Sequence, residues 1–196
     1  MKFLKEWGPF ILFVLVLGLS RLFLWQPVKV DGHSMDPTLA DGERLIVLDH
    51  TKINRFDIVV AKETEDGQTK EIVKRVIGMP GDTITYNDDT LYINGKEVVE
   101  KYLDEYKQAF DDDQLQDIYA YNSLFQELAE KADAFTTDSD GNTEFTVKVP
   151  KGVYYLMGDD RIVSKDSREV GTFPKSSIVG EVKFRFWPLS KIGFIE

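Results

Sequence analysis

The chain has 196 residues, of which 42% are hydrophobic and 12% aromatic, a composition typical of one globular domain with a sizeable core. It contains no cysteine, which excludes disulfides, thiolate nucleophiles and cysteine-ligated zinc. His33 and His50 are its only histidines, so a three-histidine metal site is excluded as well, and we expect neither a metal nor a cofactor. The formal net charge of −10 argues against nucleic acid as a partner, because phosphate binding requires positive charge.

The N-terminal segment, residues 7–28, has the composition of a membrane-spanning helix. Arg21 is its only charged residue, and a helix of this length would extend about 33 Å, enough to cross the hydrocarbon core of a bilayer. Trp7 and Trp25 lie near its two ends, where interfacial aromatic residues are enriched. The segment is therefore expected to be a single transmembrane helix.

The orientation of this helix follows from the charges before it. Residues 1–6 carry two lysines, which predict a cytoplasmic N-terminus and place residues 29–196 outside the membrane. Two alternatives remain open. The small residues in Gly18–Ser20 are also typical of a cleavable secretory signal, and an apolar helix can also be buried in a soluble protein.

Residues 29–196 are rich in short β-branched runs that are separated by Gly, Pro, Asn and Asp, which is typical of antiparallel β structure. Asn94 and Gly95 between two such runs predict a tight hairpin. We therefore expect residues 29–196 to form a mostly β domain built on an antiparallel sheet. The expected strands are residues 27–30, 43–48, 57–61, 71–76, 83–86, 90–93, 96–99, 145–149, 153–157 and 182–187.

The β pattern is interrupted at residues 101–144. Residues 101–135 contain no Gly or Pro, and their apolar spacing predicts one or two amphipathic helices. Acidic residues outnumber lysines twelve to two between Asp104 and Glu144. We expect a small, acidic, partly helical insertion, which forms either a solvated helix face followed by a loop or a surface for partner recognition.

Ser34 is the first residue with the setting of a catalytic group. It is preceded by the permissive Gly32 and followed by the turn dipeptide Asp36-Pro37, so it is expected on an exposed irregular segment. There its hydroxyl and its backbone N–H can both face a substrate. A serine before Asp-Pro is also a common turn or capping residue, so Ser34 needs a partner to be catalytic.

Lys74 is the candidate partner, because it ends the apolar run Ile72-Val73. To act as a general base, its pKa must fall from about 10.4 to about 7, which burial beside aliphatic groups can achieve. A lysine that points to solvent is the alternative. The neighbouring Arg75 stays charged and is expected in a structural ion pair.

A third cluster, residues 158–171, is dense in short polar side chains between two expected strands. Ser164 in this cluster could orient the Lys74 amine, as a third group orients the base in other catalytic triads. Asp166 and Arg168 are expected to hold the loop through hydrogen bonds.

Four stretches, in chain order behind the apolar segment, form a recognisable set. They are S-M-D-P-T-L at 34–39, R-F-D-I-V-V at 55–60, K-R-V-I-G-M-P-G-D at 74–82 and G-D-D-R-x-x-S-x-D-S-R-x-x-G at 158–171. Together they resemble the bacterial type I signal peptidases, the Ser/Lys leader peptidases, and the chain's size resembles the Gram-positive members. Phe56 stands where Gly is more usual in that pattern, and Asp160 where Asn is more usual.

The resemblance implies a membrane-bound serine endopeptidase with Ser34 as nucleophile, Lys74 as general base and Ser164 holding Lys74 in place. It also implies an oxyanion hole that uses the Ser34 backbone N–H. Some members add a serine hydroxyl two residues before the nucleophile. That position is Gly32 here, so its backbone N–H or a water would be the second donor. Structural roles are implied for Arg75, Asp159, Asp166 and Arg168.

The implied substrate is the N-terminal signal peptide of a secreted preprotein, bound extended, with small residues at the −1 and −3 positions. Membrane lipid and the secretion translocon are the other implied partners. The substrate pockets would be lined by Val28, Val30, Met35, Leu39, Ile72 and Val73.

Two competing interpretations are carried forward. The first is a hydrolase with a Ser-His-Asp triad, in which His50 would be the base. The second is a non-catalytic or client-specific assembly factor for surface or pilus proteins on the same fold. Intact Ser34, Lys74 and Ser164 argue against the second interpretation.

Overall fold

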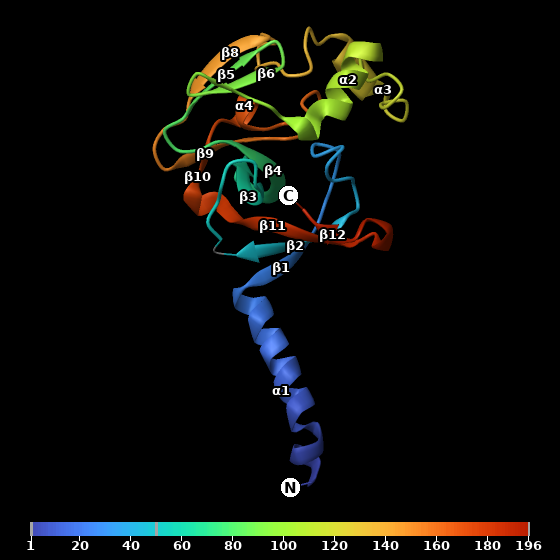
Figure 1. Ribbon diagram of the computed structural model, residues 1–196, viewed down its shortest axis with the longest axis vertical. Helices are drawn as coiled ribbons and strands as arrows, with labels where there is room; N and C mark the ends of the chain where they lie inside the picture. The colour runs from blue at the N-terminus through green and yellow to red at the C-terminus, as the bar shows by residue number, and fades with distance from the viewer. Residues whose placement is uncertain (1, 50, 196) are drawn as a thin grey trace.

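Helix α1 (Lys2–Phe23) extends away from the rest of the chain in the computed structural model, which describes residues 2–49 and 51–195 (Figure 1). The side chains of Phe10–Leu17 are exposed on every face of the helix. A helix that packs on a protein body is apolar on one face only, so α1 lacks the pattern of a packed helix. Within the described part of the chain, no helix combines the length and the apolarity needed to cross a membrane.

The prediction of helix through Val28 is wrong for its last residues. The helix ends at Phe23, and Trp25–Lys29 form strand β1, which pairs antiparallel with β2 (Arg44–Asp49) from Trp25 opposite Leu48 to Lys29 opposite Arg44. Backbone pairing with β2 satisfies the donors and acceptors of this segment, so the helix does not continue into it.

Residues 2–49 and 51–195 form two antiparallel sheets, and the larger has eight strands. Their order is β1-β2-β11-β3-β4-β9-β10, and β12 pairs with β11. Its neighbouring strands are antiparallel throughout, so the predicted mostly β, antiparallel fold is confirmed. Besides β1 and β2, its strands are β3 (Ile58–Glu65), β4 (Gln68–Gly78), β9 (Val153–Met157), β10 (Phe173–Pro174), β11 (Ile178–Trp187) and β12 (Gly193–Phe194).

The smaller sheet has four strands in the order β7-β6-β5-β8. Asn94 and Gly95, the two residues between β6 and β7, have φ angles of 52° and 77°. Two positive φ angles are the geometry of a tight hairpin, so the predicted turn is confirmed. The strands are β5 (Thr83–Asn87), β6 (Thr90–Ile93), β7 (Lys96–Val98) and β8 (Glu144–Lys148).

Between β7 and β8 the chain forms the helical insertion, which lies beside the smaller sheet (Figure 1). It has a core of its own, in which the rings of Tyr106, Tyr119 and Phe135 pack together. Not all of its apolar residues are buried in this core: Tyr121, Leu124 and Leu128 are exposed. The helices of the body are a 3₁₀ turn (Lys101–Leu103), α2 (Asp104–Asp113), α3 (Ser123–Glu130), α4 (Ser167–Val170), and two further 3₁₀ turns (Lys175–Ser177 and Leu189–Lys191).

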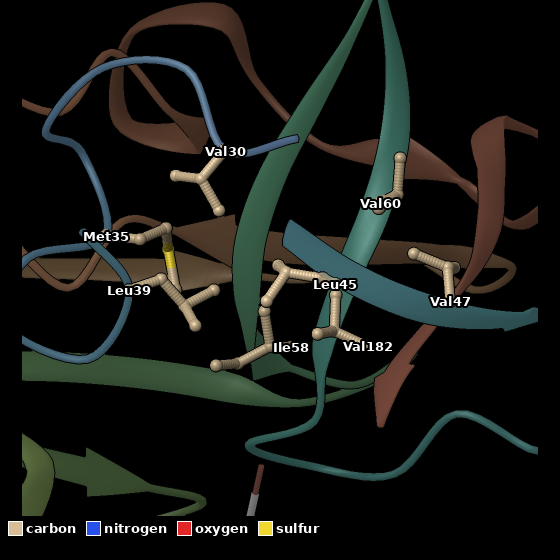
Figure 2. Close-up of a cluster of buried hydrophobic side chains, with 8 residues drawn as sticks. All are labelled: Val30, Met35, Leu39, Leu45, Val47, Ile58, Val60 and Val182. Atoms are coloured by element: carbon tan, nitrogen blue, oxygen red, sulfur yellow. The ribbon is translucent and has the colours of Figure 1, made fainter. Parts of the chain in front are cut away.

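One core cluster holds the segment that contains Ser34 against the larger sheet (Figure 2). We call residues 30–43, which connect β1 to β2, the Ser34 loop. Val30, Met35 and Leu39 of this loop are buried against side chains from the three strands β2, β3 and β11, namely Leu45, Val47, Ile58, Val60 and Val182. The loop is therefore anchored by buried side chains on both sides of Ser34.

Phe56 departs from the resemblance in a way that the backbone explains. Its φ is 69°, in the left-handed region that favours glycine, the more usual residue there. The conformation is fixed by two hydrogen bonds: the Phe56 N–H donates to the Val76 carbonyl over 2.8 Å, and its carbonyl accepts from Arg75 over 2.9 Å. The two hydrogen bonds to β4 therefore hold Phe56 in a backbone conformation that is unfavourable for a residue with a side chain.

Candidate active site

Ser34 is presented by a loop whose polar groups are paired with one another. The Gly32 N–H donates to Asp41 Oδ1 over 2.8 Å, and His33 Nδ1 lies 2.8 Å from Asp36 Oδ2. Gly32 has φ of 87°, a conformation that a side chain would strain. These hydrogen bonds, together with the buried side chain of Met35, fix the position of the Ser34 hydroxyl.

Lys74 reaches Ser34 from the larger sheet. It lies on β4 opposite Val59 of β3, and its Nζ is 2.7 Å from Ser34 Oγ. The side chain is only 4% exposed. Burial lowers the pKa of the Lys74 amine, an effect that the carboxylates of Asp166 and Glu63 partly oppose. A buried amine with a lowered pKa beside a serine hydroxyl has the geometry of a nucleophile and its base.

Arg75 points to the opposite face of β4, because successive side chains of a strand alternate. Its Nε donates to Asp159 Oδ1 over 2.9 Å and its Nη2 to Oδ2 over 2.7 Å. Thr38 of the Ser34 loop donates to the same Oδ2 over 2.6 Å, and the Arg75 guanidinium stacks 3.9 Å above the ring of Tyr102. One buried ion pair thus ties together the segments that carry Ser34, Lys74 and Ser164.

Asp166 closes the loop that contains Ser164. Its carboxylate accepts hydrogen bonds from the Gly158 N–H over 3.0 Å and from both Nε and Nη2 of Arg168 over 2.9 Å. Burial would raise the pKa of Asp166, but the charge and hydrogen bonds of Arg168 outweigh burial and hold that pKa below its usual range. Asp166 also caps α4 by accepting from the Arg168 N–H, so one carboxylate organises both ends of the loop.

Ser164 lies close to Ser34, but its hydroxyl does not make the expected hydrogen bond to the Lys74 amine. Its hydroxyl is buried and has no hydrogen-bond partner among residues 2–49 and 51–195. Gly158 shows how closely the segments meet: a Cβ there would lie 2.2 Å from Ser164 Oγ and 2.3 Å from the Ser34 carbonyl. The sequence interpretation missed Gly158, for which the glycine at the start of the last motif was the available signal.

Only one of the two expected oxyanion donors is free. In the part of the chain that the structure describes, the Ser34 N–H donates to no acceptor. The Gly32 N–H is already bonded to Asp41, which argues against Gly32 as the second donor. The backbone therefore offers one donor for a developing negative charge next to Ser34.

A cleft of about 660 Å³ opens beside Ser34 and Lys74. Five predicted pocket residues line it: Val28, Val30, Met35, Ile72 and Val73. Leu39 does not line it, because its side chain is fully buried in the core beneath the Ser34 loop. The sequence interpretation missed Val60 and Glu63 of β3 and Phe125 of the insertion, which also line it.

The cleft follows an open strand edge. Residues Gln68–Ile72 of β4 pair with β3, whereas pairing of β4 with β9 begins at Arg75. The edge from Lys70 to Lys74 can therefore receive an extended peptide as an added strand. The small apolar side chains around it would favour small residues of that peptide.

His33 is held away from the role of base by its own contacts. His33 is paired with Asp36 and packs against the ring of Tyr121 at 5.1 Å between centroids. His50, the other candidate base, lies outside the described residues. Lys74 Nζ is the basic atom found within hydrogen-bond distance of Ser34 Oγ in residues 2–49 and 51–195.

The chain is similar to known proteins over nearly its whole length. The model of a family described as signal peptidase, peptidase S26, matches residues 4–187. The chain is 58% identical to signal peptidase I of Streptococcus pneumoniae (strain R6), over 98% of this chain and 97% of that protein. It is 41% identical to signal peptidase I T of Bacillus subtilis (strain 168), over 95% and 87% respectively.

A solved signal peptidase I from Enterococcus faecalis is 31% identical to the chain, covers 67% of it and 97% of the solved chain, and superimposes with a TM-score of 0.48. The family match spans nearly the whole sequence, including Ser34, Lys74 and the last motif. The chain therefore belongs to the signal peptidase family, peptidase S26.

Proposed function

We propose that this chain is a serine endopeptidase that removes N-terminal signal peptides from secreted preproteins, with Ser34 as nucleophile and Lys74 as general base. The observation that carries the assignment is the 2.7 Å approach of a buried lysine amine to Ser34 Oγ beside an open cleft. The near full-length likeness to signal peptidases I supports the substrate class. A non-catalytic assembly factor is not favoured, because such a protein has no need of the buried amine.

The chemistry follows from these positions. The neutral Lys74 amine takes the proton of the Ser34 hydroxyl while Oγ attacks the scissile carbonyl carbon, and the resulting oxyanion lies toward the Ser34 N–H. The protonated amine then gives its proton to the departing peptide nitrogen, which leaves an acyl-enzyme. A water molecule hydrolyses this ester with Lys74 again as base, so Ser34 and Lys74 return to their starting state.

The substrate would lie extended along the open edge of β4, between Ile72 and the residues around Val30. Backbone hydrogen bonds to a strand edge provide affinity, and the side chains beneath provide selectivity. Shallow pockets lined by valine and isoleucine accept alanine at the −1 and −3 positions and exclude larger groups.

The direct test is incubation of the purified full-length chain with a model preprotein, followed by mass spectrometry of the products. One cut after a small residue with another small residue two positions earlier is the expected result. Intact preprotein after prolonged incubation, with a folded chain, would instead favour the assembly-factor interpretation.

Ser164 is proposed to position the Lys74 amine once substrate orders the site. Its buried, unpartnered hydroxyl supports this role, because an unsatisfied buried hydroxyl is unfavourable unless it acquires a partner. We expect Ser164→Ala to lower kcat by about tenfold or more with little change in Tm. Enzyme kinetics and thermal unfolding on the same preparation check this. Full activity with a lower Tm would leave Ser164 with a structural role only.

The pH profile tests the state of Lys74. Because burial lowers the pKa of this amine, its neutral form is available at lower pH than for a solvated lysine. We expect kcat/KM to rise with pH to an optimum at neutral or mildly alkaline values, with an acidic limb well below about 10.4. An acidic limb that continued to climb beyond pH 10 would identify an ordinary solvated amine.

Membrane anchoring through the N-terminal segment is proposed, with the catalytic body outside a single-pass helix. The support is the run of exposed apolar side chains at Phe10–Leu17 of α1 and the two lysines, Lys2 and Lys5, that come before this run. The substrate would then reach the enzyme at the same membrane surface, where the secretion translocon releases it. Alkaline extraction of membranes and protease accessibility of the body from the outer side test this. Release of the full-length chain by alkali would contradict it.

A further inference from the structure

The helical insertion is joined to the nucleophile by two consecutive hydrogen bonds. Tyr119 lies between α2 and α3, and its hydroxyl donates to Asp160 Oδ1 over 2.6 Å. The backbone N–H of the same Asp160 donates to the carbonyl of Ser34 over 3.2 Å. Tyr119 and Asp160 are both fully buried, so solvent does not compete for these bonds.

A second contact joins the same two segments next to the nucleophile. The ring of His33 lies 5.1 Å from that of Tyr121 and 5.9 Å from that of Phe125, both of the insertion. Phe125 also packs edge-on against Tyr119 at 5.5 Å. Of the two aromatic rings of the insertion that contact the Ser34 loop, that of Phe125 therefore also packs against Tyr119.

Asp160 also joins the Ser34 loop to the loop of Ser164. Its carbonyl accepts from the Ser164 N–H over 3.1 Å, while its N–H is bonded to Ser34. A shift of Asp160 would thus displace Ser34 and Ser164 together. Attack by a nucleophile is sensitive to such shifts, since a displacement of about 1 Å can cost about 100-fold in rate.

The carboxylate of Asp160 lies in an unusual setting. Burial raises the pKa of Asp160 to about 7, an effect that the Tyr119 hydroxyl and the amides of Val163 and Ile162 only partly offset. The charge of Asp36 in the Ser34 loop contributes to this raised pKa. The other titratable groups near it are Tyr106 and Tyr121 of the insertion, whose own pKa values are raised by burial and by Asp160.

We propose that Tyr119 and Asp160 are positioning residues for Ser34, through which the helical insertion holds the nucleophile in line with Lys74. The proposal rests on the proposed function of Ser34. It gives the insertion a part in catalysis, beyond a solvated face or a surface for partners. Neither residue touches the reacting atoms; both act through the backbone of residues 34 and 160.

The first test compares Tyr119→Phe with Tyr106→Phe in cleavage of a model preprotein. Tyr106 packs edge-on against Tyr119 at 6.4 Å in the same cluster but makes no hydrogen bond to Asp160, so it is the matched control. We expect Tyr119→Phe to lower kcat about tenfold with KM within about twofold, and Tyr106→Phe to keep the parental kcat. Parental kcat in Tyr119→Phe, or an equal loss in both variants, would overturn the proposal.

The second test uses two replacements of Asp160. Asp160→Asn keeps an acceptor for the Tyr119 hydroxyl and removes the charge, whereas Asp160→Leu removes the acceptor. We expect Asp160→Leu to lose kcat as Tyr119→Phe does, and Asp160→Asn to keep most of the parental kcat.

The pH dependence of the parent provides a further comparison. An ionised carboxylate accepts a stronger hydrogen bond than a neutral group. In the parent, activity should therefore increase as Asp160 ionises near pH 7, in addition to the increase caused by deprotonation of Lys74. Asp160→Asn should show only the increase caused by Lys74. Equal kcat in the two variants would contradict the proposal.

A third measurement does not depend on activity. Hydrogen exchange of the Asp160 amide, which donates to the Ser34 carbonyl, should be at least about tenfold faster in Tyr119→Phe than in Tyr106→Phe. If the parent fails to cleave preprotein, the proposed function is refuted, but the exchange rate still reports whether Tyr119 stabilises the hydrogen bond between Asp160 and Ser34. If the parent cleaves but exchange and kcat are unchanged in Tyr119→Phe, the positioning role alone is refuted.

Discussion

Ser34→Ala and Lys74→Met are each expected to lower the rate of preprotein cleavage by at least about 10³-fold while the chain remains folded. The two side chains act as one unit across 2.7 Å, so either change leaves no activated nucleophile. Lys74→Arg should not restore activity, because a guanidinium stays protonated at any working pH. Cleavage rates measured by gel shift, with circular dichroism to verify folding, check both variants. Substantial cleavage by Lys74→Met would make His50 the residue to examine.

Lys74→Met should also change stability, in a direction that identifies the buried amine. The pKa of Lys74 is lowered in the folded state, so the unfolded chain binds more protons between that pKa and about 10.4. In this interval the amine makes the free energy of unfolding rise with pH. Below this interval the buried amine is charged in the folded state, and its destabilising effect is largest. Removing the amine should raise Tm near neutral pH and flatten its pH dependence. An unchanged Tm profile would mean that the amine is solvated.

Asp159→Ala is expected to lower the free energy of unfolding by about 3–5 kcal/mol, the largest stability effect that we foresee. The change leaves the guanidinium of Arg75 buried without its bidentate acceptor and removes the acceptor of Thr38. Urea denaturation monitored by tryptophan fluorescence gives the value.

The exposed pair between Glu127 and Lys131 on α3 provides the control for Asp159→Ala. Glu127→Ala removes a carboxylate from a solvated i,i+4 pair, so it should barely change the urea midpoint. The double variant Arg75→Met/Asp159→Leu should recover much of the loss, because two apolar groups leave no buried charge. A loss in Asp159→Ala as small as that in Glu127→Ala would show that the ion pair contributes little.

The strands were predictable because the signals that define them are local. Short β-branched runs and the turn residues between them located ten of the twelve strands found in residues 2–49 and 51–195, including the two joined by the Asn94-Gly95 hairpin. β10 and β12 are two residues each, and only their pairing with β9 and β11 defines them. The end of α1 was misplaced because the apolar composition of Trp25–Lys29 suits both a helix and a strand, and the partner strand decides between them.

The candidate site was predictable only in part, for a similar reason. The motifs indicate Ser34 and Lys74, but their approach depends on the fold of residues that are forty positions apart. Leu39 shares the apolar character of the pocket residues, and only packing against Leu45 and Ile58 places it in the core. The bond from Tyr119 to Asp160 spans 41 positions between segments with no common pattern, so it could be found only in three dimensions.

The adjacency of Lys74 and Arg75 on β4 has a consequence for length changes in this chain. Lys74 is opposite Val59 and Arg75 opposite Ile58, and a slip of one residue would exchange the faces of the two cations. A guanidinium would then face Ser34, and an ammonium would meet Asp159 without a fork to match it. A one-residue deletion within either arm of the β3–β4 hairpin would therefore abolish catalysis and destabilise the fold at once. Residues added at the hairpin tip, at Asp66 and Gly67 between Glu65 and Gln68, leave the register of the arms unchanged. The tip can thus lengthen without harm to the dyad, whereas the arms must keep their residue count.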